Sequence, residues 1–363
     1  MTVATIVVTC YQQRAYLRDA VRSALAQDAG DVRVVVVDDG STDCPQEVLG
    51  GLDGVMVLRK DNGGQASAWN ASRDFLAGEA VIFLDGDDLL APDTVRRALP
   101  LLRRGAVKVH GALAVIDGSG APAGPDVPRR ALDDGDLGAV VAEAGPTVLG
   151  WPPTSGNTWA LSFLTTYLPV PAEDFRVSPD VYLCSLAAAA GRVAALEGPV
   201  GSWRLHGANA SNDLDLLGRT ERECAHWQAT FPAVARVLAD RGRPVGAAAL
   251  STWPGWPFRL RSALHRLARL LPADAVVVLL DEDQWAAGTT VLGRTRLHLH
   301  GAGDYAGPPS SAEDALALLG ARRDSGATHL VTAWPAAWWL DHFGLATVGQ
   351  MVHTDDDLVV RRL

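Results

Sequence analysis

The stretch that decides the fold is Ala80-Val-Ile-Phe-Leu-Asp85-Gly-Asp87-Asp88-Leu-Leu-Ala-Pro-Asp93. Its first five residues form an uninterrupted apolar run, which is typical of a strand buried on both faces of a sheet. The run stops at three crowded aspartates, Asp85, Asp87 and Asp88. Ligands of open α/β sheets bind outside the carboxyl ends of the strands, so these aspartates lie where we expect the chemistry.

Strands of the same kind precede this stretch, and each is followed by polar residues. They are predicted at Val3–Val8 before Thr9-Cys10-Tyr11, at Val32–Val37 before Asp38-Asp39-Gly40, and at Val55–Leu58 before Asp61-Asn62-Gly63-Gly64. Residues 16–27 and 66–76 have apolar residues at helical spacing. Strands that alternate with helices predict an α/β fold with a Rossmann-like, mostly parallel sheet.

The remainder of the chain predicts a second, smaller α/β unit. Its expected strands and helix are Ala275–Leu280, Thr289–Leu292, Ala312–Arg322 (the helix), His329–Thr332 and Leu358–Arg361. The segment before it mixes Arg, Gly, Pro and Trp, which indicates a connection. We therefore expect a first domain at residues 1–235, a linker with an amphipathic helix at 236–272, and an accessory α/β domain at 273–363.

Composition and charge restrict the functional classes. The chain has 32 Lys and Arg against 42 Asp and Glu, a net charge of −10. Neutralising phosphates needs a basic face, so nucleic acid is excluded as a main partner. The only lysines are Lys60 and Lys108, and almost every cation is arginine. With no secretory leader and no long apolar stretch, a cytoplasmic protein is expected.

The crowded aspartates need compensation. Like charges about 4 Å apart repel by roughly 4 kcal/mol at an effective dielectric of about 20. The repulsion is relieved when one carboxyl is protonated, when some carboxylates face water, or when a cation lies among them. Oxygen ligands suit Mg²⁺ or Mn²⁺, which commonly bridge one or two carboxylates to substrate phosphates. An Asp-rich turn that leads into a helix cap is the alternative that the residues alone leave open.

The order of the motifs carries a family resemblance. This chain resembles family 2 glycosyltransferases of the GT-A fold in four stretches. They are Val3–Tyr11, Val-Val-Asp38-Asp39-Gly-Ser-Thr-Asp43, Asn62-Gly-Gly64 with Asn70, and Phe83–Asp93. The stretch Trp203-Arg-Leu-His206-Gly-Ala-Asn209-Ala-Ser211 is similar to Tyr-Arg-x-His-x-x-Asn-x-Ser in many members. The resemblance covers about residues 1–225 and implies a sugar-nucleotide-dependent transferase with a GT-A domain.

The resemblance implies how the nucleotide would be held. Thr9 and Tyr11 would flank the base, with Tyr11 stacked on it. Asp39 would accept a hydrogen bond from an N–H of the base, usually uracil. Asn62 and Gly64 would let the backbone approach the nucleotide closely. The expected donor is therefore a nucleoside-diphosphate sugar, with UDP or TDP as the nucleotide.

A divalent ion is implied by the same motifs. Asp87 would be a direct ligand of Mn²⁺ or Mg²⁺, and Asp85 would lie nearer the ribose or the sugar. His206 matches a histidine that in several members reaches the metal or the diphosphate, and a structural histidine is the alternative. The ion would act as a Lewis acid that neutralises charge on the leaving nucleoside diphosphate.

Asp180 is the expected general base. Members often carry Glu-Asp at the start of a helix, and this chain has Ser178-Pro179-Asp180 there. Asp180 matches the base that takes the proton of an acceptor hydroxyl, while Pro179 departs from the usual Glu. Family members invert the anomeric carbon by direct displacement. Because Pro and Asp are favoured at helix starts in any case, a non-catalytic sugar-nucleotide or glycan-binding protein on the same fold stays open.

Two features near the end of the chain have more than one interpretation. Trp253–Leu271 is amphipathic and would either meet a lipid-linked acceptor at the inner face of the membrane or dock two domains, which we favour. The segment Trp334-Pro-Ala-Ala-Trp338-Trp339-Leu-Asp resembles one that is associated with accessory domains of such transferases. We favour packed tryptophans over sugar-stacking ones. The acceptor, on a glycan or a lipid, is not defined by the sequence.

Overall fold

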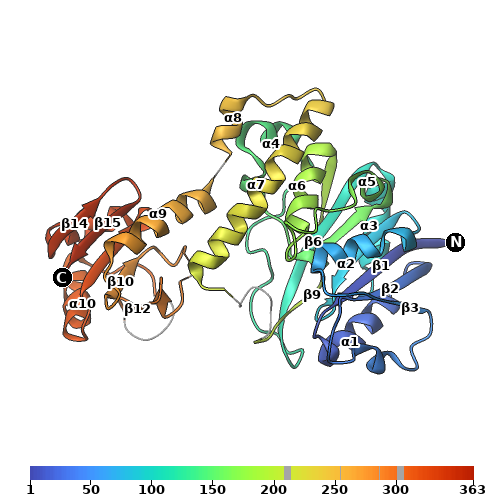
Figure 1. The fold of residues 1–363 in the computed structure, drawn as a ribbon, viewed down its shortest axis with the longest axis horizontal. Helices are drawn as coiled ribbons and strands as arrows, with labels where there is room; N and C mark the ends of the chain where they lie inside the picture. The colour runs from blue at the N-terminus through green and yellow to red at the C-terminus, as the bar shows by residue number, and fades with distance from the viewer. Residues whose placement is uncertain (208–213, 254, 286, 301–305) are drawn as a thin grey trace. The chain divides into compact units, whose positions relative to one another are not determined.

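The computed structural model describes residues 1–207, 214–253, 255–285, 287–300 and 306–363 (Figure 1). The chain divides into two compact units, one made of Met1–Ala210 and Ala225–Pro254 and the other of Ser211–Cys224 and Gly255–Leu363. Each unit has its own sheet. The predicted α/β class, with a larger first unit and a smaller second one, is confirmed.

The sheet of the first unit has the strand order β3-β2-β1-β4-β8-β6-β9-β5, with β7 paired to β9. Its strands are β1 (Thr2–Cys10), β2 (Asp31–Asp38), β3 (Val55–Arg59), β4 (Ala80–Asp85), β5 (Leu89–Leu90), β6 (Ala106–Asp117), β7 (Gly135–Asp136), β8 (Asn157–Ala160) and β9 (Arg192–Leu205). Strands β3, β2, β1 and β4 are parallel. Strand β8 is antiparallel to β4 and β6, so the second half of the sheet is mixed.

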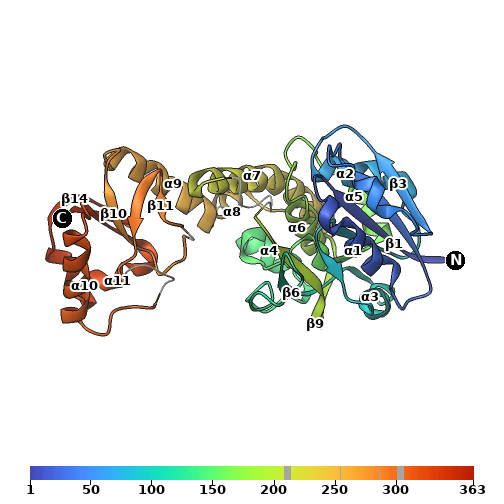
Figure 2. The same ribbon diagram turned by 90° about the horizontal axis from the view of Figure 1, so that it is seen from below.

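Helices cover this sheet because its central strands are apolar on both faces. Residues 80–84 of β4 and 34–38 of β2 are all buried. The helices of this unit are α1 (Arg14–Leu25), α2 (Gln65–Ala71), α3 (Thr94–Arg103), α4 (Gly138–Ala144), α5 (Leu161–Tyr167), α6 (Asp180–Ala190) and α8 (Ala247–Thr252), and the long helix α7 (Leu216–Asp240) has residues in both units. Helix α1 packs against β1 and β2, as Figures 1 and 2 show, and α6 packs against β6 and β9.

The register of the parallel strands brings their polar ends to one edge. Thr9 pairs with Asp85 of β4, and its neighbour Cys10 pairs with Asp38 of β2. The polar residues at the ends of β1, β2 and β4 therefore lie side by side, as the apolar runs predict.

The second unit has a sheet with the order β11-β12-β10-β13-β15-β14. Its elements are α9 (Trp256–Leu270), β10 (Val276–Leu280), β11 (Thr290–Val291), β12 (Arg294–Leu297), α10 (Ala312–Asp324), β13 (His329–Ala333), α11 (Trp338–His342), β14 (Gln350–Thr354) and β15 (Leu358–Arg362). Strands β12, β10 and β13 are parallel. All the elements predicted for this unit are present, and β12, β14 and α11 are additional.

The apolar face of α9 is buried within the second unit. Its buried residues Leu260, Ala263, Leu264 and Leu267 share a core with strands of the sheet. Of the tail tryptophans, Trp339 is buried in a core and Trp338 is half exposed. No helix in the described ranges combines the length and the apolar character that a membrane crossing needs.

Candidate functional site

The Asp39 carboxylate is the centre of a hydrogen-bonded loop. It accepts hydrogen bonds from Lys60 Nζ at 2.6 Å, from the backbone N of Gly63 at 3.0 Å and of Gly64 at 2.7 Å, and from Asn62 Nδ2 at 3.2 Å. Asp39 is buried, and its own N–H donates to Cys10 O at 3.0 Å. A carboxylate has about four acceptor positions, so these donors occupy nearly all of them.

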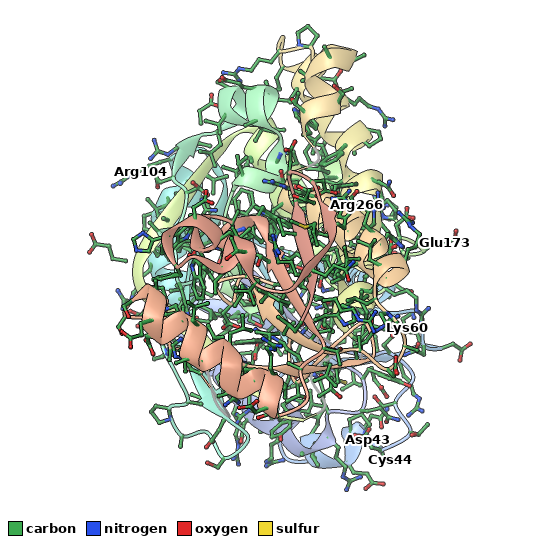
Figure 3. All side chains as sticks on the ribbon, turned by 90° about the vertical axis from the view of Figure 1, so that its left-hand side faces the viewer. Asp43, Cys44, Lys60, Arg104, Glu173 and Arg266 are labelled. Atoms are coloured by element: carbon green, nitrogen blue, oxygen red, sulfur yellow. The ribbon has the colours of Figure 1, made fainter. Side chains whose placement is uncertain are left out.

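The predicted nucleotide residues Asn62 and Gly64 belong to this same loop. Gly64 has a φ of 87°, and a Cβ there would lie 2.6 Å from Arg176 O. Asn62 Oδ1 accepts a hydrogen bond from Arg176 Nη2 at 2.6 Å. An open hollow beside the loop is lined by Gly40, Arg59, Lys60, Asp61 and Asn62. Lys60, labelled in Figure 3, is therefore part of both the carboxylate anchor and the hollow.

Thr9 and Tyr11 stand at the end of β1. Thr9 is buried beside Asp85, and its carbonyl accepts a hydrogen bond from Gly86 N at 2.9 Å. Tyr11 follows the strand and is half exposed. Thr9 thus connects the first strand to the acidic cluster, whereas the ring of Tyr11 is accessible from solvent.

The three crowded aspartates have different surroundings. Asp85 Oδ1 accepts a hydrogen bond from Gln65 Nε2 at 2.6 Å. Asp88 accepts from Ser155 Oγ at 2.6 Å and from Arg204 N at 2.9 Å. Burial and the neighbouring carboxylates raise the pKa of Asp85 well above its usual range and the pKa of Asp88 to about 8. Asp88 is thereby a structural group, and burial favours the uncharged form of both Asp85 and Asp88.

Asp87 and His206 form a pair at the same edge. His206 Nε2 donates to Asp87 Oδ2 at 2.9 Å, and the two side chains are 10% and 9% exposed. The imidazole stacks on Tyr16 with ring centroids 4.8 Å apart, and Arg204 Nε donates to Asp87 O at 2.8 Å. Across the described residues, no three His, Cys, Asp or Glu side chains come together as a set that could hold a metal ion. Asn209 and Ser211 of the same motif lie outside the described residues.

Asp180 opens α6 and faces the acidic cluster. Its Oδ1 is buried and has no hydrogen-bond partner in the part of the chain that the structure describes. Burial raises the pKa of Asp180 to about 6, against the smaller opposing effects of backbone N–H groups and Lys108. The charge of Asp180 acts on Asp85, so the two carboxyls are neighbours. An unpartnered carboxyl oxygen with a pKa near neutrality is chemically suited to accept a proton.

Gln65 joins the acidic cluster to the segment before Asp180. Its amide nitrogen donates to Asp85 Oδ1, and its Oε1 accepts from Ser178 N at 3.1 Å. Ser178 has a φ of 58°, a left-handed conformation that a residue without special support rarely adopts. One side chain at the start of α2 therefore holds both Asp85 and the turn that leads into α6.

Comparisons with known proteins agree with this arrangement. Residues 5–133 match the family described as Glycosyl transferase family 2. An uncharacterized glycosyltransferase from Nostoc sp. is 29% identical over 242 residues, which are 65% of this chain and 74% of that protein. Residues 5–133 are therefore a glycosyl transferase family 2 domain, and the chain is a glycosyltransferase. Its first unit carries the family domain, and the second unit follows it.

Two further similarities are more limited. Chondroitin synthase from Pasteurella multocida is 40% identical over 99 residues, which are 26% of this chain but only 10% of that protein. The solved structure of TarS from S. aureus in complex with UDP shares 17% identity with a TM-score of 0.49, covering 74% of this chain and 78% of that one. The latter similarity is too loose to locate a ligand in this glycosyltransferase.

Several residues of the candidate site were not predicted. They are Gln65, Ser155 and Arg204, which hold the aspartates, and Lys60 and Lys108, which lie near Asp39 and Asp180. For the lysines a signal exists, because they are the only two in the chain. Arg204 lies inside the motif that contains His206. Gln65 and Ser155 have no local signal, since their partners are distant in the sequence.

Proposed function

We propose that this glycosyltransferase moves a sugar from a nucleoside-diphosphate donor to an acceptor hydroxyl with inversion, with Asp180 as the general base. The observation that carries the proposal is the buried, unpartnered Oδ1 of Asp180 beside Asp85. In a direct displacement, the acceptor O–H proton passes to Asp180, the acceptor oxygen bonds to the anomeric carbon, and the bond from that carbon to the phosphate oxygen breaks. No covalent glycosyl-enzyme is formed.

The donor end of the site is proposed at Thr9, Tyr11, Asp39, Asn62 and Gly64. The half-exposed ring of Tyr11 and the open hollow beside Asn62 are compatible with a base and ribose there. Because Asp39 already accepts hydrogen bonds from Lys60 and three loop donors, it would share its oxygens with a base N–H or exchange one donor for it. UDP and TDP both offer such an N–H, and they are the proposed nucleotides.

Asp87 and His206 are the proposed ligands of Mn²⁺ or Mg²⁺. One carboxylate and one imidazole suit such an ion when substrate phosphates complete its coordination. The fit is supported by position, because Asp87 and His206 lie within hydrogen-bonding distance of each other at the polar edge of the sheet. When bound, the ion would neutralise charge on the departing nucleoside diphosphate.

A thermal-shift screen of UDP-, TDP- and GDP-sugars with Mn²⁺, followed by nucleoside-diphosphate release assays, tests the proposal. We expect a UDP- or TDP-sugar to raise the melting temperature, and release to require Mn²⁺ or Mg²⁺. Release should disappear in Asp87→Ala and persist in Asp93→Ala, a partly exposed aspartate at the start of α3. Turnover at the wild-type rate in EDTA would reject the metal ligands. Donor binding without release across a panel of acceptors would instead favour a non-catalytic binding protein.

The acceptor is proposed to be a hydroxyl on a glycan or on a lipid-linked sugar. The Pasteurella multocida relatives are named as synthases of chondroitin and hyaluronan, which supports a glycan. A lipid-linked acceptor implies a cytoplasmic enzyme at the inner membrane face. Co-sedimentation with anionic liposomes tests that contact, and equal sedimentation of the wild type and of Arg269→Glu would argue against it.

A further inference from the structure

The side chain of Gln65 joins two parts of the first unit that are distant in the sequence. Its Nε2 donates to Asp85 Oδ1 at 2.6 Å, and its Oε1 accepts from Ser178 N at 3.1 Å. The N–H of Ser178 can only donate, so the atom facing it is the amide oxygen, and the amide nitrogen faces Asp85. Both ends of the amide are therefore fixed, and the acidic cluster is tied to the turn before α6.

The position of Asp180 follows from that turn. Its Oδ1 is buried and has no hydrogen-bond partner in the described part of the chain, so the backbone that carries the side chain sets the place of this oxygen. Asp180 is the first residue of α6, and it is joined to Ser178 through Pro179, whose ring restricts φ. A rotation of the backbone at Ser178 would therefore move the carboxyl of Asp180.

Ser178 needs support from outside its own segment to keep this geometry. Its φ of 58° lies in the left-handed region, which serine rarely adopts. Within the segment, Ser178 O accepts a hydrogen bond from Val181 N at 3.2 Å, which engages the carbonyl of Ser178 but not its N–H. The partner of the N–H is the amide of Gln65, which belongs to a different helix, α2. This side chain therefore holds the turn at the point where its backbone is unusual.

Backbone hydrogen bonds hold α2 against the same segment without help from the Gln65 side chain. Gln65 N donates to Arg176 O at 2.8 Å, and Ala66 N donates to Phe175 O at 3.3 Å. A change of the Gln65 side chain leaves these bonds in place, so the two segments stay together while the turn loses its tie to Asp85. Such a variant tests the position of the turn rather than the formation of the fold.

We propose that Gln65 is a positioning residue for the general base: its amide fixes the turn before α6 against Asp85 and thereby places the Asp180 carboxyl to meet the acceptor hydroxyl. The inference rests on the proposed role of Asp180. A glutamine that only stabilises the fold would change the free energy of unfolding and leave the rate of the folded enzyme unchanged. The two roles are therefore separable by measurement.

Gln65→Met removes both side-chain hydrogen bonds at nearly constant size. We expect kcat for nucleoside-diphosphate release, with the acceptor that the wild type uses fastest, to fall on the order of 10²-fold, because a displacement of about 1 Å has an effect of that size. The dissociation constant of the donor, measured by calorimetry, should change much less than kcat. Gln65→Ala, which also lacks both bonds and suits a helix, provides the same reading if the methionine variant does not fold.

Gln27 provides a matched control for the loss of a bridging amide. It is buried, its Nε2 donates to Ala91 O at 2.8 Å, and its Oε1 accepts from Val95 N at 3.1 Å. Gln27→Met should therefore lower the stability in urea unfolding, as Gln65→Met does, and keep the wild-type kcat. An equal fall of kcat in the two variants, or a wild-type kcat in Gln65→Met, would overturn the inference.

The Ser178 amide gives a measurement that does not depend on activity. Its N–H is bound by Gln65 in the wild type, so its exchange with D₂O, followed by NMR on the full chain, should be faster in Gln65→Met. Exchange of the same amide should be unchanged in Gln27→Met. An exchange rate in Gln65→Met equal to that of the wild type would mean that Gln65 does not hold the turn, and the inference would fail.

A double-mutant cycle distinguishes this inference from the proposed function. If Gln65 acts through Asp180, the substitution Gln65→Met should lower kcat far less in the Asp180→Asn background than in the wild type. An impaired Asp180→Asn in which Gln65→Met has its full effect would overturn the inference and leave Asp180 as the base. Transfer by Asp180→Asn alone at the wild-type rate would instead mean that the proposed function fails.

Discussion

The first unit contains two aspartates whose carboxyl groups have opposite surroundings. Asp39 accepts hydrogen bonds from Lys60, Asn62 and the backbone of Gly63 and Gly64, whereas Asp180 has a buried oxygen with no partner in the described part of the chain. The first arrangement stabilises a charged carboxylate and fixes a loop. The second leaves a buried carboxyl oxygen that no hydrogen bond within the described residues stabilises. The difference supports the proposal that Asp39 shapes the donor site and that Asp180 is the general base.

Asp180→Asn should have the largest effect. The amide is close in size but cannot accept the acceptor's proton, so transfer should fall by about 10²–10⁴-fold. Donor affinity, measured by calorimetry, should stay at the wild-type value because Asp180 is not proposed to contact the nucleotide. The matched control is Asp174→Asn, an exposed aspartate a few residues earlier. If the Asp180 variant transfers sugar at the control's rate, another group is the base.

Asp39→Ala should instead lower the stability of the fold and the affinity for the donor. It leaves the Lys60 ammonium and several loop donors without their acceptor, so the free energy of unfolding should fall by about 1–3 kcal/mol. Donor binding should weaken as well, since the loop of Asn62 and Gly64 is no longer held. Urea unfolding measures the change against Asp53→Ala, which alters an exposed aspartate. Unchanged stability would mean that the hydrogen bonds of Asp39 do not hold the loop.

The fold was largely predictable because its main strands are continuous apolar runs. The residues of β1, β2 and β4 are recognisable in this way, and so are their polar ends. Most of the other strands lack that signal, although β6, which was not predicted, contains the apolar run Ala112–Ile116. Strand β12 reads Arg-Thr-Arg-Leu, and β14 is mostly exposed along its length. Strand β8 has four residues and is identified as a strand only by its pairing between β4 and β6.

The site was predictable only in part, for a related reason. Motifs identify the residues that would touch a ligand, but they say little about what holds those residues. Gln65 bonds to Asp85, 20 positions away, and to Ser178, 113 positions away. The orientation of Lys108 depends on burial of both faces of β6, and a single strand pattern does not show which neighbours surround a charge. The surroundings of Asp39 and Asp180 differ for the same reason, and only the fold reveals the difference.

The smallest expected effect is the pH dependence of stability that Asp180 contributes. Its folded-state pKa of about 6 lies above the unfolded value of about 3.9, so the folded protein retains the proton more tightly. This contribution is fully present below about pH 4 and is lost as the pH rises through about 6. Asp180→Asn should therefore be more stable than the wild type at pH 7, and the difference should vanish near pH 4. Chemical unfolding at a series of pH values, with Asp174→Asn as the control, measures it. A wild type that is as stable as Asp180→Asn at neutral pH would mean that the buried carboxylate is fully compensated, and the contrast with Asp39 would then disappear.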